Sequence, residues 1–375
     1  MRYLANFVRK DLEKKMVFVA GPRQCGKTTF AKSILEKSGA GHYFNYDRDR
    51  DRVLLLKEKW SDTDKLLVFD ELHKYPKWKN WLKGMYDTEK DKHQILVTGS
   101  ARLNVYKKGG DSMAGRYHSW RLHPFSLSEI PSKITREQAF VKLMTVGGFP
   151  EPFLDGSETA ARRWRKARFD QVIKDDIRDL ENIKNINMLT LLIDLLKQRV
   201  GSLIVVANLA GDLQVSPITI NRWIQALEKL YFIFVVRPFS KNVARSLQKP
   251  FKVFFYDNAE VDGDDGAKFE NLVANHLLKK IEFLEDSTGY RYQLGFIRDR
   301  EKREVDLVVI KENTLEYLVE VKLSDTQTSK NLLFFAERLN PKKAIQIVAH
   351  GNKSYKKNSF ELQSALNSEL LLSLS

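Results

Sequence analysis

One loop near the amino terminus constrains the fold of this chain more than any other feature. It follows an apolar segment, 16–20, that is rich in valine and phenylalanine and typical of a buried parallel strand. The spacing G-x-x-x-x-G-K-T predicts a loop whose backbone N–H groups point at phosphate oxygens, followed by a helix over 29–37. The residues of this P-loop are Gly21, Pro22, Arg23, Gln24, Cys25, Gly26, Lys27, Thr28 and Thr29.

The P-loop and a second apolar run predict a site for ATP and Mg²⁺. We expect Lys27 to neutralise the β- and γ-phosphates and Thr28 to offer its hydroxyl to Mg²⁺, while the helix dipole favours the anion. The run 66–69 ends in Asp70 and Glu71, where the aspartate can hold Mg²⁺ through water and Glu71 can polarise the attacking water. Hydrolysis is therefore the predicted reaction. The alternative is that Glu71 is a solvated residue at a strand end.

Further strands and two accessory groups complete the predicted ATPase core. The segments that read as parallel strands are 41–46, 94–98 and 117–122. The hydroxyls of Thr98 and Ser100 are both candidates for sensing the γ-phosphate. Arg116 is a candidate arginine finger for a neighbouring subunit, which would require a homo-oligomer, although such a residue is more often a surface salt-bridge partner.

Length, charge and cysteine content limit the classes of protein that the chain can represent. Its 375 residues exceed what one hydrophobic core usually serves, so we expect about two to four domains. A single cysteine, Cys25, excludes a disulfide framework or a cysteine-rich zinc site. Without a long apolar run or an export signal over 1–19, we expect a cytoplasmic protein and no membrane partner. The net charge of +15 favours nucleic acid as the partner, or reflects excess lysine that only aids solubility.

Six sequence segments form a combination that spans nearly the whole chain. They are GPRQCGKTT at 21–29, FDELHK at 69–74 with Trp78 after it, TGS at 98–100, AGR at 114–116, PFS at 124–126 and GGFPE at 147–151. Together they resemble archaeal and bacterial AAA-type P-loop ATPases. The resemblance implies an AAA-like core and a C-terminal α/β domain with a restriction-endonuclease-like fold. It implies architecture more than function, because the biological task of these proteins is mostly unknown.

The middle of the chain is predicted to form a helical lid or linker over 136–187 and a winged helix over 188–258. The charged stretch after Ser157 is either a phosphate-contacting face or a solvated helix surface. Ser216 and Pro217 mark the start of the third helix of the winged helix, as a cap and a first-turn proline. Apolar residues at three- and four-residue spacing turn one side of that helix to a core.

The other side of that third helix and the wing supply the predicted nucleic-acid contacts. Side chains on such a helix can reach base edges, and a basic wing can meet phosphate. Winged helices also serve as protein-docking modules, which is the alternative. The candidate contacts are Thr219, Arg222, Gln225 and Lys229 on the helix and Lys241 and Arg245 in the wing.

The segment 259–352 is predicted to have an αβββαβ core, and 353–375 a tail of no assigned role. The predicted elements are a helix over 267–283, strands over 290–297, 304–310 and 316–323, a helix over 327–339 and a strand over 344–348. A hairpin symmetric about Asn313 places Asp306 opposite Glu320, and puts Lys322 on the same face.

This hairpin predicts a metal-dependent centre for phosphodiester hydrolysis. One divalent cation could bridge Asp306 and Glu320, while Lys322 orients or helps deprotonate the nucleophile. An aspartate followed by Glu-x-Lys matches the PD-(D/E)xK nucleases. Glu270, on the preceding helix, occupies the place of an extra acid in such nucleases, or is an ordinary exposed glutamate.

These features combine into the interpretation of an ATP-hydrolysing DNA-processing protein, with the ATPase core over 1–135 coupled to the winged helix and the nuclease centre. The main alternative is a regulatory DNA- or protein-binding ATPase switch whose nuclease-like domain does not cleave. A small-molecule kinase would need a phosphate-acceptor pocket and a lid in place of the winged helix. Whether the nucleic acid is DNA or RNA is left open by the sequence, with DNA favoured.

Overall fold

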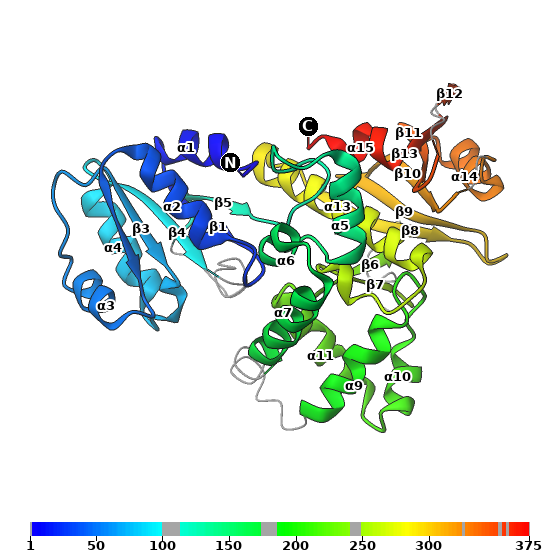
Figure 1. Ribbon diagram of the computed structural model, residues 1–375, viewed down its shortest axis with the longest axis horizontal. Coiled ribbons are helices and arrows are strands. Elements are labelled where there is room, and N and C mark those ends of the chain that lie inside the picture. Colours follow the sequence, from blue (N-terminus) through cyan, green and yellow to red (C-terminus); the bar gives the residue numbers. More distant parts are fainter. Residues whose placement is uncertain are drawn as a thin grey trace. The chain divides into compact units, whose positions relative to one another are not determined.

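The computed structural model divides the chain into two units, Met1–Pro124 and Phe125–Ser375 (Figure 1). The residues that the structure describes are 2–99, 113–173, 186–240, 249–324, 327–351, 355–357 and 360–374. Within these ranges, no helix combines the length and the apolar character needed to cross a bilayer. The first predicted boundary, at 135, lies inside the second unit rather than at its edge.

The first unit is built on a parallel five-stranded sheet in the order β2, β3, β4, β1, β5. The strands are β1 Met16–Ala20, β2 Gly41–Asn45, β3 Leu66–Asp70, β4 Gln94–Gly99 and β5 Tyr117–Arg121. The helices are α1 Ala5–Leu12, α2 Lys27–Ser38, α3 Asp49–Leu56, η1 Leu72–Lys74 and α4 Trp78–Glu89. The predicted parallel sheet and its five strands are confirmed, with ends that differ by one or two residues.

The inner strands β1 and β3 are buried, and their polar carboxyl-terminal ends lie at the same edge of the sheet. Every residue of β1 and of β3 is buried, as expected for central strands of a parallel sheet. Phe18, Phe44 and Phe69 of three strands share one core with Trp78 and Leu82 of α4. Because the strands run in the same direction, the P-loop after β1 and the acids at the end of β3 emerge at one edge of the sheet.

The second unit contains a mixed eight-stranded sheet in the order β12, β13, β11, β10, β9, β8, β6, β7. The strands are β6 Ile233–Pro238, β7 Lys252–Phe255, β8 Tyr292–Arg298, β9 Glu304–Lys311, β10 Thr314–Lys322, β11 Lys343–Val348, β12 Tyr355–Lys357 and β13 Phe360–Ser364. The helices are α5 Arg136–Thr145, α6 Pro150–Asp155, α7 Glu158–Gln171, α9 Ile186–Lys197, α10 Val206–Asp212, α11 Pro217–Lys229, η5 Asn258–Glu260, α13 Asp265–Thr288, α14 Lys330–Leu339, η6 Ala365–Asn367 and α15 Glu369–Leu372. All the elements of the predicted αβββαβ core are present in the predicted order.

The segments that the sequence divided into a winged helix and a nuclease-like domain share this one sheet. The hairpin of β6 and β7 forms as predicted, but β6 also pairs in parallel with β8. Gly295 of β8 permits the close approach, because a Cβ there would lie 3.1 Å from the carbonyl oxygen of Arg237. Pairing between strands far apart in sequence leaves no local pattern in either segment. The sequence therefore predicted a domain boundary at 258 and not the pairing of β6 with β8.

The carboxyl-terminal segment belongs to the fold and is not a tail. β13 pairs in parallel with β11, and all five of its residues are buried. Its sequence alternates Phe360 and Leu362 with Glu361 and Gln363, which reads as an exposed strand or a polar coil. The prediction was wrong because burial of the polar side chains depends on partners elsewhere: the ammonium of Lys343 lies 3.1 Å from Glu361.

Candidate functional site

The backbone of the P-loop has the conformation that the glycine spacing predicts. At Gly21 a Cβ atom would lie 2.3 Å from the carbonyl oxygen of Leu122, so only glycine fits. Gly26 has a φ of 92° and caps α2, which begins at Lys27. Cys25 is buried, and its thiol lies 3.4 Å from the same Leu122 oxygen. The loop therefore leads directly into a helix amino terminus, where backbone N–H groups can meet an anion.

Asp70, at the end of β3, collects hydrogen bonds from three hydroxyl groups. The hydroxyl of Thr28 donates to its Oδ2 at 2.6 Å, and that of Tyr43 donates to the same oxygen at 2.7 Å. The hydroxyl of Thr98 donates to Oδ1. Thr28 and Asp70, the two predicted magnesium ligands, are thus in contact, and this pair of oxygen donors fits the ion. Ser100, the other candidate phosphate sensor, lies outside the described residues.

Tyr43 is a residue of this site that the sequence analysis missed. Burial and the neighbouring Asp70 raise the pKa of its phenol, so it stays a proton donor to the carboxylate. It reaches Asp70 because β2 and β3 are adjacent, in a register that puts Tyr43 beside Val68. A tyrosine in a predicted strand gives no sign of this, since the strand order comes from the sheet.

Lys27, the first residue of α2, and Glu71, directly after β3, lie at the edge of the sheet that carries the P-loop. The Lys27 ammonium is buried and donates to the carbonyl oxygens of Gly21 at 3.0 Å and Pro22 at 2.7 Å. Glu71 follows β3 with a φ of 58°, and its backbone N–H donates to the Thr98 carbonyl at 2.9 Å. Burial raises the pKa of the Glu71 carboxyl, while the charge of Lys27 opposes that rise. A more basic carboxylate is better suited to polarise water.

Arg116 forms the surface ion pair that was the alternative to an arginine finger. Its Nε lies 2.7 Å from one oxygen of Asp87, and a second guanidinium nitrogen lies 3.0 Å from the other. This bidentate pair raises the pKa of Arg116 and lowers that of Asp87. To reach a neighbouring subunit, Arg116 would first have to leave Asp87, and both the finger and the homo-oligomer stay predictions.

The hairpin of β9 and β10 carries the predicted carboxylates of the second unit. Near the turn, Lys311 pairs with Thr314, which is not the register of a hairpin symmetric about Asn313. A bulge between Leu315 and Tyr317 shifts the pairing by one residue, so Leu307 lies opposite Val319. Continued by one residue, this register places Asp306 opposite Glu320, as the symmetric hairpin predicts. The register at Leu307 and Val319 is the predicted one, whereas the bulge that produces it was not predicted.

Asp306, Glu320 and Lys322 form a compact group, which we call the carboxylate–lysine centre. The Lys322 ammonium lies 2.9 Å from Oε1 of Glu320, and the Ser329 hydroxyl donates to that oxygen at 3.1 Å. Oδ2 of Asp306 accepts the backbone N–H of Val321 at 2.8 Å. Burial, and then the charge of Asp306, raise the pKa of Glu320 to about 7.

One oxygen of this centre lacks a hydrogen-bond partner. Oε2 of Glu320 is buried, and no group within the described part of the chain donates to it. An unpartnered buried carboxylate oxygen is costly, and beside a second carboxylate it is a position that a cation would stabilise. The donor set of two carboxylates therefore fits a divalent ion, although no group of three acidic or histidine ligands occurs among the described residues.

A buried lysine beside this centre was also missed by the sequence analysis. Lys252, on β7, has its side chain 2% exposed and lies 3.1 Å from Glu270 and 2.7 Å from Glu304. Burial alone would lower the pKa of Lys252, but Glu270, Asp306 and Glu304 together raise it. Burial raises the pKa of Glu270 to about 7, against the pull of Lys252. Glu270 is thus not the ordinary exposed glutamate of the alternative: it is a largely buried ion-pair partner of Lys252, and its role as an extra acid stays a prediction.

The predicted nucleic-acid contacts are partly placed by the structure. Arg222, Gln225 and Lys229 lie on the exposed side of α11, opposite its buried apolar residues, as the spacing predicts. Thr219 is half-buried, and its hydroxyl lies 2.9 Å from that of the cap residue Ser216. Lys241 and Arg245 of the wing lie outside the described residues.

The basic run of α7 is not uniformly exposed. The guanidinium of Arg168 lies 4.1 Å from the ring centroid of Phe149, and the residue is 2% exposed. Arg168 therefore belongs to the core of the second unit and cannot contact phosphate, since aromatic rings cover it. Arg162, in contrast, is exposed and pairs with Glu158 at 3.5 Å.

Comparison with known families defines the class of the first unit. Residues 13–131 match the model of an AAA domain, and the P-loop geometry agrees, so this unit is an AAA-type P-loop ATPase domain. Residues 137–260 and 265–368 match two separate domains of unknown function, DUF8612 and DUF4143. These matches do not show a winged-helix or a nuclease fold, which stay predictions.

Individual relatives are distant and carry little functional description. An uncharacterized protein of Mycobacterium tuberculosis is 24% identical over 64% of this chain and 54% of its own length. The chain thus spans about half the length of that relative. An uncharacterized protein of Haemophilus influenzae is 22% identical over 80% of both chains. Among solved structures, a Walker-type ATPase of Pyrococcus abyssi aligns with a TM-score of 0.44 and 13% identity, over 68% of this chain and 93% of that one.

Proposed function

We propose that this protein couples ATP hydrolysis to the processing of a nucleic acid, with DNA favoured over RNA. In this proposal the carboxylate–lysine centre hydrolyses a phosphodiester bond with Mg²⁺. In this proposal Lys27 and Thr28 hold the triphosphate and its Mg²⁺, Asp70 orients Thr28, and Glu71 positions the attacking water. Arg222, Gln225 and Lys229 of α11 contact the nucleic acid.

The observation that supports cleavage most strongly is the state of Glu320. Its Oε1 is held by Lys322 and Ser329, while Oε2 is buried beside Asp306 without a donor. A bound divalent cation would supply positive charge at the scissile phosphate and increase the acidity of a water. Asp306 and Glu320 hold such an ion, and the Lys322 ammonium, 40% exposed, is available to orient the phosphate.

A nicking assay on supercoiled plasmid DNA tests the proposal. We expect Mg²⁺-dependent nicking by the wild type and its loss in Lys322→Ala. Lys342→Ala is the matched control, because Lys342 pairs with Glu316 at 3.2 Å but lies outside the centre. Absence of nicking by the wild type with Mg²⁺ or Mn²⁺, with and without ATP and on several DNA and RNA shapes, would overturn the cleavage proposal.

A second candidate function is a regulatory ATPase switch that binds nucleic acid or protein without cleaving it. It is favoured by one observation, the pairing of Glu270 with Lys252, which removes the third carboxylate from the centre. In that case ATP turnover should respond to the bound partner, and Lys322→Ala should leave that response intact. ATPase rates measured with and without DNA, in wild type and Lys322→Ala, separate the two functions.

A further inference from the structure

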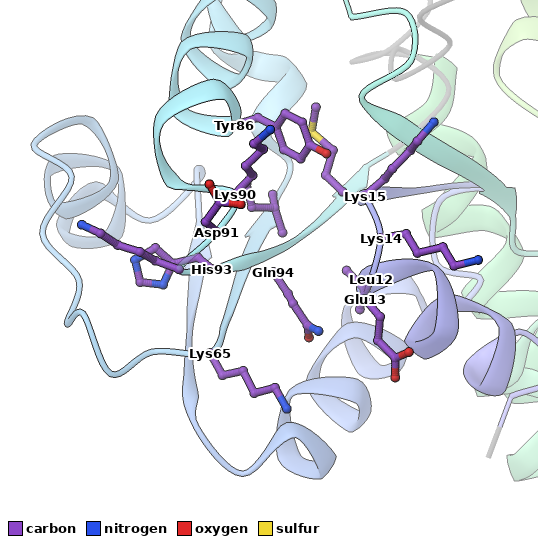
Figure 2. Close-up of a pocket in the computed structure, with 13 residues that line it drawn as sticks. Leu12, Glu13, Lys14, Lys15, Lys65, Tyr86, Lys90, Asp91, His93 and Gln94 are labelled. Atoms are coloured by element: carbon purple, nitrogen blue, oxygen red, sulfur yellow. The ribbon is translucent and has the colours of Figure 1, made fainter.

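A basic pocket lies at the edge of the ATPase sheet where β1, β3 and β4 begin. Its lining includes Met16 and Gln94, the first residues of β1 and β4, and Lys65, which precedes β3. Figure 2 labels Lys65 and Gln94. The P-loop follows the opposite end of β1, so the pocket and the nucleotide site lie at opposite edges of the same sheet. The volume of the pocket is about 450 Å³, and it is open to solvent.

Positive charge dominates the lining of this basic pocket. The lining contains five lysines and two acids, Glu13 and Asp91. The lysines are Lys14 and Lys15 after α1, Lys65 before β3, and Lys90 and Lys92 after α4. Figure 2 shows that Lys14 and Lys65 come from different segments of the chain.

Most of these lysines form no ion pair with another described residue. Lys92 lies 3.5 Å from Glu89 and 3.7 Å from Asp62. Over the described ranges, Lys14, Lys15, Lys65 and Lys90 form no ion pair within 4.0 Å. Gathered like charges repel one another, and an anion bound between them relieves that repulsion.

The construction of the pocket favours an extended anion over a small one. Its charges sit on long flexible stems, and Lys14, Lys65 and Lys90 are exposed. A lysine ammonium is a compact, strongly hydrated point charge, which suits phosphates that are spaced along a polymer. The net charge of +15 raises the local concentration of any polyanion around the whole chain.

We propose that the basic pocket binds the sugar–phosphate backbone of a nucleic acid. This inference deepens the proposed function, since it rests on nucleic acid being the partner and assigns to the ATPase unit its own backbone contact. The pocket holds the backbone through Lys14, Lys65 and Lys90, without reading bases. A nucleic acid bound there contacts the amino-terminal ends of β1 and β3. The carboxyl-terminal ends of these two β-strands lead to the P-loop and to Asp70.

A charge-reversal experiment with a matched control tests this site. The pocket variant carries Lys14→Glu, Lys65→Glu and Lys90→Glu, and the control carries Lys10→Glu, Lys57→Glu and Lys59→Glu. The control lysines are exposed residues of the same unit outside the pocket, so both variants change the net charge equally. Both are made with Lys322→Ala to prevent cleavage, and binding of fluorescein-labelled duplex DNA is measured by anisotropy over a salt series.

We expect the pocket variant to bind at least about tenfold more weakly than the control, because it loses phosphate contacts and gains repulsion. Each phosphate contact contributes about 0.9 to the slope of log affinity against log salt for duplex DNA, so the slope should fall by about two to three. Equal affinities and equal slopes in the two variants would show an effect of net charge alone and overturn the proposal. An equal loss of binding to polyglutamate would also overturn it, in favour of an acidic protein partner.

Two further measurements keep the result interpretable. Thermal unfolding and DNA-free ATP hydrolysis should match in both variants, and if the pocket variant does not fold, Lys65→Glu alone should lower the slope by about one. Cleavage is measured separately on the protein with Lys322 intact. If the wild type binds DNA through the pocket but never nicks it, the cleavage proposal is contradicted and the proposal for the basic pocket still holds.

Discussion

The nucleotide site of the first unit and the carboxylate–lysine centre of the second contain the same kinds of groups but differ in whether the carboxylate oxygens have hydrogen-bond partners. Each contains a lysine beside buried carboxylates. In the first, both oxygens of Asp70 accept hydroxyl protons and Lys27 is held by loop carbonyls. In the second, Lys322 holds one oxygen of Glu320 and the other has no donor among the described residues.

This difference separates a site that is complete within the protein from one that is not. Asp70 needs no further partner for its burial, so the P-loop can hold its shape before nucleotide arrives. The region around Glu320 keeps four acids, Asp306, Glu320, Glu270 and Glu304, close to two lysines, Lys252 and Lys322, with one oxygen of Glu320 unpaired among the described residues. Such an arrangement is stable only when cations balance the charge, and Lys252 is the cation that the fold itself supplies.

The largest expected effect tests whether Lys252 is that balancing cation. Lys252→Met should destabilise the second unit by about 3–5 kcal/mol, because it leaves the buried Glu270 without its ion-pair partner, while Glu304 keeps its pair with Arg298. The measurement is urea unfolding. Adding Glu270→Gln and Glu304→Gln should recover part of the loss.

The matched control for Lys252 is Lys343→Met in the same sheet, because the Lys343 side chain is 33% exposed and its partner Glu361 keeps a second cation, Lys356, at 3.4 Å. It should cost less than about 1 kcal/mol. Equal losses in the two variants would show that Lys252 acts only by packing, and the contrast drawn between the two sites would then fail.

The next largest effect is expected on ATP hydrolysis at the nucleotide site of the first unit. Lys27→Ala should lower kcat/KM for ATP by about 10²–10³, because a preorganised charge at the phosphates is lost. Unfolding of the second unit should be unchanged. Steady-state phosphate release is the measurement, with Lys57→Ala, an exposed lysine of the same unit, as the control. Full activity in Lys27→Ala would place nucleotide chemistry elsewhere.

A metal titration asks whether the unpaired Glu320 oxygen is a cation site. Mn²⁺ at about 100 times its dissociation constant should stabilise the second unit by about 2.7 kcal/mol. Asp306→Asn and Glu320→Gln should each abolish most of this shift, which calorimetry in the absence of nucleotide can measure. A Mn²⁺ shift of equal size in Glu320→Gln would exclude the centre as the site.

The smallest effect is a pH dependence of stability in the absence of metal. The folded-state pKa of Glu320, about 7, lies above its ordinary value, so its protonation stabilises the fold below that ordinary value, and this contribution is lost as the pH rises through 7. The unfolding free energy should therefore fall between about pH 5 and pH 8, by no more than about 1.4 kcal/mol per pH unit for each proton.

Glu320→Gln should flatten this profile, whereas Glu301→Gln, at an exposed carboxylate, should not. Glu270 shifts in the same direction, so the slope should decrease without vanishing. A wild-type profile that rises with pH over this range would contradict the assignment of the buried, proton-binding carboxyls.

Much of both sites could be predicted because their signals are local. The spacing from Gly21 to Thr28 dictates the loop, and apolar runs before it and before Asp70 dictate the strands. Alternation in β9 and β10 placed Asp306 and Glu320 on one face, and the register at the site is the predicted one. Strand periodicity is strict, so a single correct pairing determines which side chains share a face.

What could not be predicted depends on contacts between distant segments. Lys252 is the first residue of a predicted strand, Lys252 to Tyr256, whose other residues are apolar, and nothing in this segment indicates a role for the lysine. It meets Glu270 and Glu304 only because β6 pairs with β8 and brings β7 to the same sheet. Glu270 was predicted to be an extra acid of the nuclease-like centre or an ordinary exposed glutamate, since its partner Lys252 comes from a different predicted domain.

By itself, the sequence determined the AAA-type nucleotide loop, the order of the elements and the two carboxylates of the hairpin, because each follows from residue spacing along one or two neighbouring segments. The tertiary structure alone decided that β13 is a buried strand, that Tyr43 and Thr98 hold Asp70, that Lys252 balances the acids, and that lysines from three segments line one pocket. These depend on strand order and pairing, which are set by burial of the whole sheet.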